Sequence, residues 1–175
     1  ENITRQIQEL LNLYKLKNFA YAEIIANNLI NKYPKEVFIY NILGLILTAQ
    51  NKIDEAIICY EKGLKIDKNF AMIYNNLGTI YKSKKKYLQA EKYYRKSINL
   101  NKKIPEPQNN LGNLYRALNK DYKAIDHYLN AIKIDSKFFP GHYNLGITYK
   151  SIGKFDKAKF HLEETIKLNE NLFMA

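Results

Sequence analysis

Four stretches of this chain share a Leu-Gly centre: YNILGLIL at 40–47, YNNLGTIY at 74–81, QNNLGNLY at 108–115 and HYNLGITY at 142–149. Their glycines are Gly44, Gly78, Gly112 and Gly146, each 34 residues after the one before. A constant period of this length indicates a repeat protein, in which each repeat contributes one small structural unit and buries its apolar face against its neighbours.

A second series extends the period to five repeats: Ala22, Ala56, Ala90, Ala124 and Ala158. We number the places of each repeat so that the glycine falls at place 8. Apolar residues at helical spacing predict two helices per repeat, the second beginning near place 17. Asn51, Asn119 and Gly153 fall at the turn between them, where a left-handed residue commonly ends a helix. The predicted repeats are 3–36, 37–70, 71–104, 105–138 and 139–172, with a sixth starting at 173.

The spacing resembles the tetratricopeptide repeat (TPR) family, in which Leu-Gly, a tyrosine, an alanine and an aromatic residue recur within 34 residues. Repeat 3 carries Tyr74, Leu77, Gly78, Tyr81, Ala90 and Tyr94 at these places. Repeat 1 departs, with Leu10 for the glycine and Ala26 for the aromatic residue. The resemblance, greatest to O-linked N-acetylglucosamine transferase and bacterial TPR proteins, implies a single all-α domain over 1–175. That domain would be a right-handed α-solenoid, or superhelix, of about five TPR helix-turn-helix units with its tyrosines in the core.

The side of each first helix opposite the glycine is expected to line the concave surface, where this family generally binds its partners. Amides there can pair with a peptide backbone, and Lys or Arg favours acidic groups. The sequence therefore predicts a protein-binding scaffold that holds an extended, acidic peptide. The predicted contacts are Asn41, Asn75, Asn76, Thr79, Lys82, Asn109, Asn110, Asn113, Arg116, Asn144 and Lys150.

Part of this set resembles the asparagine ladder of O-linked N-acetylglucosamine transferase. Asn76, Asn110 and Asn144 occupy the matching place, whereas Ile42 departs from it. The pattern of the dicarboxylate clamp, which binds chaperone tails, is not met beyond Asn76. The alternative is structural: asparagine is abundant in this chain, and the basic residues of the set are ordinary solvated side chains.

The formal net charge of +11 admits other anionic partners. RNA-binding helical repeats have a slightly longer period and lack the Leu-Gly, Tyr, Ala pattern, so RNA is the weaker alternative. A further alternative comes from bacterial proteins with similar N-terminal repeats: this chain would position substrates for a larger transferase, such as a glycosyl- or sulfotransferase.

Catalytic and metal sites are not predicted. The sequence holds no Gly-rich phosphate loop, HExxH or GxSxG segment, so we expect no enzyme activity and no cofactor. His127 and His161 share place 23 with Cys59, but helices of neighbouring repeats lie about 8–10 Å apart, too far to share a zinc ion readily. We interpret these residues, and His142 at core place 4, as structural.

The remaining expectations concern location and assembly. The longest apolar stretch, Ile42–Ala49, is far shorter than the roughly 20 residues of a membrane span, and the N-terminus lacks a secretory pattern. One unpaired cysteine fits a reducing compartment, so a cytoplasmic protein is expected. The last helix, expected over 155–168, has no capping helix after it. We therefore expect end-to-end self-association through its apolar flank.

Overall fold

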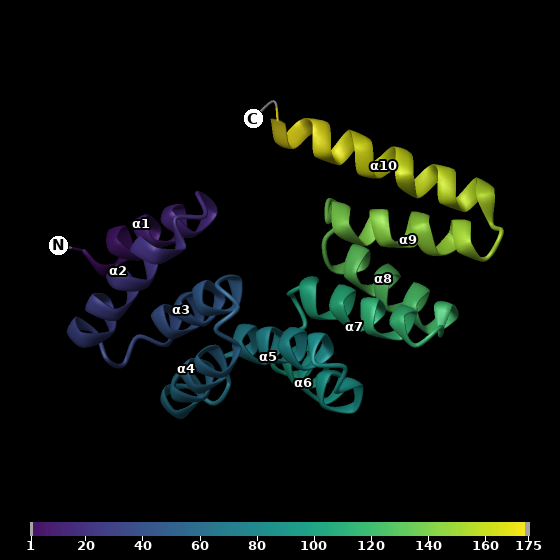
Figure 1. Cartoon of the computed structure of the whole chain (residues 1–175). Coiled ribbons are helices and arrows are strands. Elements are labelled where there is room, and N and C mark those ends of the chain that lie inside the picture. Colours follow the sequence, from purple (N-terminus) through teal and green to yellow (C-terminus); the bar gives the residue numbers. More distant parts are fainter. Residues whose placement is uncertain (1, 174–175) are drawn as a thin grey trace. The chain divides into compact units, whose positions relative to one another are not determined.

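The computed structural model describes residues 2–173, and the side chains of residues 2–169. All the regular structure in this part of the chain is α-helical (Figure 1), which confirms the predicted all-α fold. The helices are α1 (Ile3–Lys15), α2 (Phe19–Lys32), α3 (Val37–Ala49), α4 (Ile53–Ile66), α5 (Ala71–Ser83), α6 (Tyr87–Leu100), α7 (Glu106–Ala117), α8 (Asp121–Ile134), α9 (Phe139–Ser151) and α10 (Phe155–Phe173).

The helix boundaries follow the 34-residue period. The first helix of each repeat begins at the predicted start, except α7, which begins one residue later, after Pro105. Every second helix begins at place 17, as predicted. The last helix, α10, runs to Phe173 and is longer than the expected 155–168. The predicted sixth repeat begins at this residue, and its next two residues, Met174 and Ala175, lie outside the described part of the chain.

Each helical hairpin turns through a left-handed residue at place 15. This is the predicted Asn51, Asn119 or Gly153 in three repeats, and Lys17 or Lys85 in the other two, with φ between 56° and 75°. The backbone N–H of place 16 donates to the carbonyl of place 11 in all five repeats, which is the hydrogen bond of a Schellman ending. The turn is therefore the same in every repeat, although only three sequences signal it.

The chain divides into two compact units, Glu1–Ile80 and Tyr81–Ala175, with the boundary inside α5. In the first unit, α3 packs against α1, α2 and α4. In the second unit, α7 packs against α6, α8 and α9, and α9 packs against α8 and α10. Helical hairpins therefore stack side by side within each unit, while the single-domain extent of 1–175 stays a prediction.

The core of the hairpin in repeats 2, 3 and 4 is built around the aromatic residue at place 24. Tyr60, Tyr94 and Tyr128 are fully or almost fully buried, as expected for core tyrosines. A Cβ on Gly112 would lie 2.5 Å from the Cε1 atom of Tyr128, so only glycine lets the two helices come this close. The buried Tyr60 hydroxyl lies near Thr48 and Asn76 but lacks the geometry of a hydrogen bond with any described residue.

Candidate peptide-binding site

Asparagines at places 5 and 6 form hydrogen-bonded pairs between consecutive repeats. Asn76 donates from Nδ2 to Oδ1 of Asn41 over 2.9 Å, and Asn144 donates in the same way to Asn109 over 2.8 Å. The two acceptors are buried, with exposed fractions of 1% for Asn41 and 6% for Asn109. The expectation that place 5 lies on the open side is therefore wrong for these two residues. Their amides meet the neighbouring repeat instead, because a buried polar group needs a partner.

The other predicted amides remain partly accessible. Asn75, Asn76, Asn110 and Asn144 are half-buried, and Thr79 is exposed. The Thr79 hydroxyl donates to the backbone carbonyl of Asn75 over 3.2 Å, which is a bond within one helix turn. Contact between these residues and a peptide stays a prediction.

Three of the predicted residues come together in one hollow of the second compact unit. Lys82, Asn113 and Arg116, together with Ala117, line a space of about 350 Å³. Lys82 lies near the end of α5, whereas the other three lie on α7 at spacings of three and four residues and so share one face of the helix. Two cationic groups and one amide therefore converge on the same space.

The electrostatics of this hollow favour an anion. Lys82 is half-buried, and burial lowers the pKa of its ammonium group because it removes water from the charge. A carboxylate in the hollow would replace part of that lost solvation. Arg116 is half-buried as well and adds a second positive charge.

A buried tyrosine orients the amide in the hollow. Tyr128 donates from its hydroxyl to Oδ1 of Asn113 over 2.8 Å. Burial raises the pKa of Tyr128 to about 12, although the nearby Arg116 opposes the shift, so this hydroxyl remains a donor at neutral pH. With its oxygen used in this way, Asn113 presents its Nδ2 group as the donor for a ligand.

The hollow is not repeated at the last predicted basic residue. Lys150 occupies place 12 of repeat 5, like Lys82 and Arg116 in their repeats, but it is exposed and does not line the hollow. Place 9 of that repeat is Ile147, where repeat 4 has Asn113. Lys150 therefore has the same place in its repeat as Lys82 and Arg116, but its surroundings differ from theirs.

The histidines make contacts that the sequence did not indicate. His127 stacks on Tyr115 and lies 2.8 Å from Oε1 of Gln108 through Nδ1. The Nδ1 atoms of His142 and His161 lie 3.1 Å apart within repeat 5, so one ring donates to the other. The repeat spacing aligns the residues at place 23 of different repeats. It does not indicate this contact between places 4 and 23 of one repeat. Among the described residues, no group of three or more His, Cys, Asp or Glu side chains is placed to hold a metal ion.

Profiles of one repeat family match most of the chain. A profile described as TPR repeat matches residues 44–85 and 112–153, and two described as tetratricopeptide repeat match residues 71–104 and 139–172. This chain belongs to the tetratricopeptide repeat family. The TPR resemblance seen in the sequence is confirmed, and the unmatched N-terminal segment contains repeat 1, whose sequence departs from the pattern.

Solved TPR structures share the solenoid fold. The crystal structure of MamA matches 94% of this chain and 96% of its own, with 21% identity and a TM-score of 0.71. That of the APC/C hetero-tetramer Cut9–Hcn1 matches 97% of this chain and 32% of its own, with 18% identity and a TM-score of 0.83. Pseudomonas aeruginosa PilF matches 94% and 75%, with 16% identity and a TM-score of 0.81. Identities this low show a common fold, and no curated protein sequence matches the chain.

TPR solenoids are typically protein-interaction scaffolds without a catalytic role.

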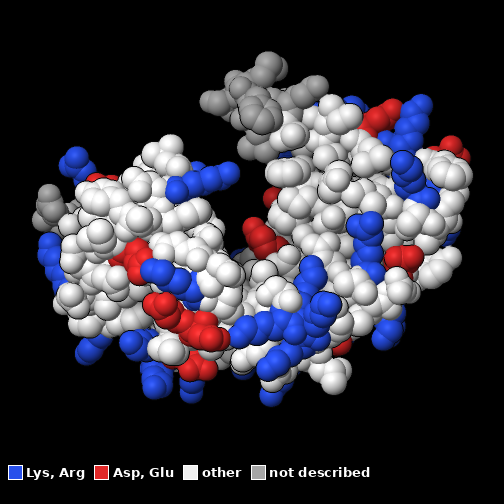
Figure 2. All heavy atoms as spheres, in the orientation of Figure 1, with Lys and Arg blue, Asp and Glu red and all other residues white. Residues whose placement is uncertain are grey.

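Figure 2 shows Lys and Arg side chains over several parts of the visible face, with Asp and Glu between them. Basic residues on that face are therefore interspersed with acidic ones. Within residues 2–173, no helix has both the length and the apolar character of a membrane span.

Proposed function

We propose that this TPR protein is a scaffold that holds an extended acidic peptide of a partner protein, with a carboxylate of that peptide in the hollow formed by Lys82, Asn113 and Arg116. The observation that carries the proposal is the convergence of these three side chains on one space of about 350 Å³. An ionised carboxylate accepts hydrogen bonds from ammonium, guanidinium and amide donors, and bonds of this charge-assisted kind are among the strongest in proteins.

The partly buried Lys82 supports an anionic rather than a neutral ligand. Its charge is held where burial disfavours it, and a neutral peptide group would compensate this cost less than a carboxylate does. A guanidinium next to it adds the fork geometry that suits a planar carboxylate. The half-buried amides of Asn110 and Asn144 are the groups through which the same unit would bind the peptide backbone.

Fluorescence anisotropy with a labelled peptide of alternating Gly and Glu, compared with its Gly and Lys counterpart, tests the proposal. We expect the acidic peptide to bind more tightly. Lys82→Gln and Arg116→Gln are each expected to weaken its binding by about tenfold, since each removes a charge-assisted hydrogen bond. The matched control is Lys150→Gln, which removes the same charge from the same place of an adjacent repeat but outside the hollow. It should weaken binding by about twofold or less.

Two outcomes would refute the proposal. One is an equal loss of affinity in all three variants, because only net charge would then matter. The other is tighter binding of a labelled single-stranded RNA of equal charge, with a steep loss between about 50 and 200 mM salt, which would favour the RNA alternative. If the repeats position substrates for a transferase, the same hollow would hold the substrate protein, and the peptide assay tests that alternative equally.

The proposed end-to-end self-association concerns α10. Phe155 and Ile166 on this helix are 68% and 57% exposed, and their spacing of eleven residues places them on one face of the helix. Contiguous exposed apolar surface of this kind commonly marks an interface. Sedimentation velocity over a range of concentrations is expected to show association that Ile166→Glu abolishes. Concentration-independent monomers would contradict the proposal.

A further inference from the structure

In each of the three C-terminal repeats, an aromatic ring on the first helix stacks on a ring on the second helix. The residue at place 11 stacks on the residue at place 23, with ring centroids 5.1 to 5.7 Å apart and planes within 19° of parallel. The pairs are Tyr81 with Tyr93, Tyr115 with His127, and Tyr149 with His161. In these repeats a ring on the second helix therefore packs against a ring on the first helix of the same hairpin.

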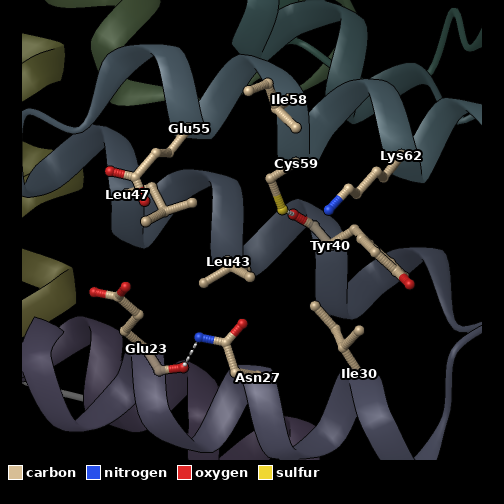
Figure 3. Close-up of a pocket in the computed structure, with 10 residues that line it drawn as sticks. All are labelled: Glu23, Asn27, Ile30, Tyr40, Leu43, Leu47, Glu55, Ile58, Cys59 and Lys62. Atoms are coloured by element: carbon tan, nitrogen blue, oxygen red, sulfur yellow. Dashed lines mark hydrogen bonds between the residues drawn. The ribbon is translucent and has the colours of Figure 1, made fainter.

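Repeat 2 lacks both rings. Leu47 stands at place 11 and Cys59 at place 23, so neither side chain fills the volume that a stacked pair fills elsewhere. A hollow of about 330 Å³ lies at this position in the first compact unit, between α2 and α4 and above α3, and both residues line it. Its other lining residues, all drawn in Figure 3, are Glu23, Asn27, Ile30, Tyr40, Leu43, Glu55, Ile58 and Lys62.

The middle of this hollow is apolar and chemically inert. Leu43, Leu47 and Ile58 line the hollow together with Cys59, whose thiol donates to the backbone carbonyl of Tyr40 over 3.3 Å. Burial raises the pKa of the Cys59 thiol to about 12, so it stays protonated at neutral pH. A protonated sulfur among aliphatic side chains is a favourable contact for an aromatic ring.

One end of the hollow is acidic. Figure 3 shows Glu23 and Glu55 at the same end, on α2 and α4, with Lys62 on the other side of Cys59. Lys52 lies 2.8 Å from Glu23, and this hydrogen bond lowers the pKa of the Glu23 carboxyl, which is therefore ionised at neutral pH. The carboxylates of Glu23 and Glu55 and the ammonium group of Lys52 together give that end a net negative charge. The whole chain, by contrast, carries a net charge of +11.

We infer that this hollow receives an aromatic side chain of a partner protein, with a basic residue next to it that pairs with Glu55. The partner's ring would occupy the place that the chain's own ring takes in repeats 3 to 5, and the basic group would complement the acidic end. The volume is within the range of about 300–1,000 Å³ found for small ligand sites and suits one such side chain. The site is formed by residues of Glu1–Ile80 and shares none with the hollow of Lys82, Asn113 and Arg116.

Blocked dipeptides provide the probes: acetyl-Lys-Tyr-amide, acetyl-Glu-Tyr-amide and acetyl-Lys-Ala-amide. Their binding is followed by backbone amide shifts in NMR spectra of the full chain. We expect the Lys-Tyr probe to shift the signals of Asn27, Leu43 and their neighbours. It should bind about fivefold more tightly than the Glu-Tyr probe, as expected for one exposed ion pair. The Lys-Ala probe should cause no saturable shift there.

A larger side chain at a residue that lines the hollow should fill it and so block the probe. Cys59→Tyr places a tyrosine at place 23, as repeat 3 has with Tyr93, and should weaken the Lys-Tyr probe by about tenfold or more, while Cys59→Ala keeps the hollow open and the binding. If Cys59→Tyr does not fold, the exposed Glu55→Lys substitution serves instead and should reverse the preference towards the Glu-Tyr probe. Unchanged binding in a folded Cys59→Tyr, no reversal in Glu55→Lys, or tighter binding of free tyramine than of the Lys-Tyr probe would overturn the inference.

Discussion

The substitution Asn76→Ala separates a structural role of the asparagine series from a binding role. Asn76 is the donor to Asn41, whose Oδ1 sits on a side chain that is only 1% exposed. Removal of the donor leaves a buried acceptor without its partner, which costs about 1–3 kcal/mol. Alanine favours the helix by up to about 0.7 kcal/mol, so we expect a net loss of about 1–2 kcal/mol in the free energy of unfolding.

Urea unfolding followed by far-UV circular dichroism, with calorimetry alongside, measures this loss. For a chain of this length the melting temperature should fall by about 2–4 °C per kcal/mol. The matched substitution is Asn144→Ala, which removes the same bond in the other compact unit. Its cost should be smaller, because Asn109 is 6% exposed and water reaches its freed carbonyl more easily.

The double variant Asn41→Ala/Asn76→Ala gives the sharper comparison. It should be more stable than Asn76→Ala alone, since no buried acceptor remains to be desolvated. Two results would refute the reasoning: a single Asn76→Ala variant as stable as the parent chain, or a double variant whose loss equals the sum of the two single losses. Either result would mean that the two amides are not energetically coupled.

Four further substitutions test other parts of the structure. Lys85→Gly should stabilise the chain by about 0.5–1 kcal/mol in urea unfolding, because Lys85 is exposed and holds a left-handed φ of 57° that glycine adopts without cost. Tyr128→Phe should lose about 1 kcal/mol with its hydrogen bond, whereas Tyr60→Phe should lose nothing, since that hydroxyl has no hydrogen-bond partner among the described residues. Burial and the neighbouring His142 lower the pKa of His161, so the unfolded chain takes up its proton first and stability should fall as the pH drops from 7.5 to 5.5. His161→Tyr should reduce that fall in a melting-temperature series, and an unchanged pH dependence would contradict the assignment.

Most of the helix boundaries could be predicted because the period is strict. The glycine at place 8 and the alanine at place 20 recur in four or five repeats, so each repeat confirms the register of the others. The turns of repeats 1 and 3 could be placed only from the other repeats. Lys17 and Lys85 adopt the left-handed conformation there, although nothing in the local sequence signals it. The stacked hairpin imposes that conformation on them, since the same Schellman bond closes every turn.

The direction of place 5 could not be predicted from the helix wheel alone. A wheel separates the side facing the hairpin from the side facing away, but it does not show which residues face the neighbouring repeat. Asn41 and Asn109 lie on that third side and are buried there. The hollow at Cys59 was missed for a related reason: it arises from rings that repeat 2 lacks, and only the stacked pairs of later repeats reveal the absence.

The amide pairs change which residues of the predicted set are left to bind a ligand. A side-chain amide whose oxygen accepts from the next repeat has one group fewer for a peptide, and a buried one has little surface to offer. Asn41 and Asn109 therefore stabilise the stack, and the residues at places 9 and 12 are the ones that line a hollow. Such a division also explains why a helix tolerates repeated asparagine. The helix propensity lost at each residue, up to about 0.7 kcal/mol, is offset by a buried hydrogen bond whose removal costs more.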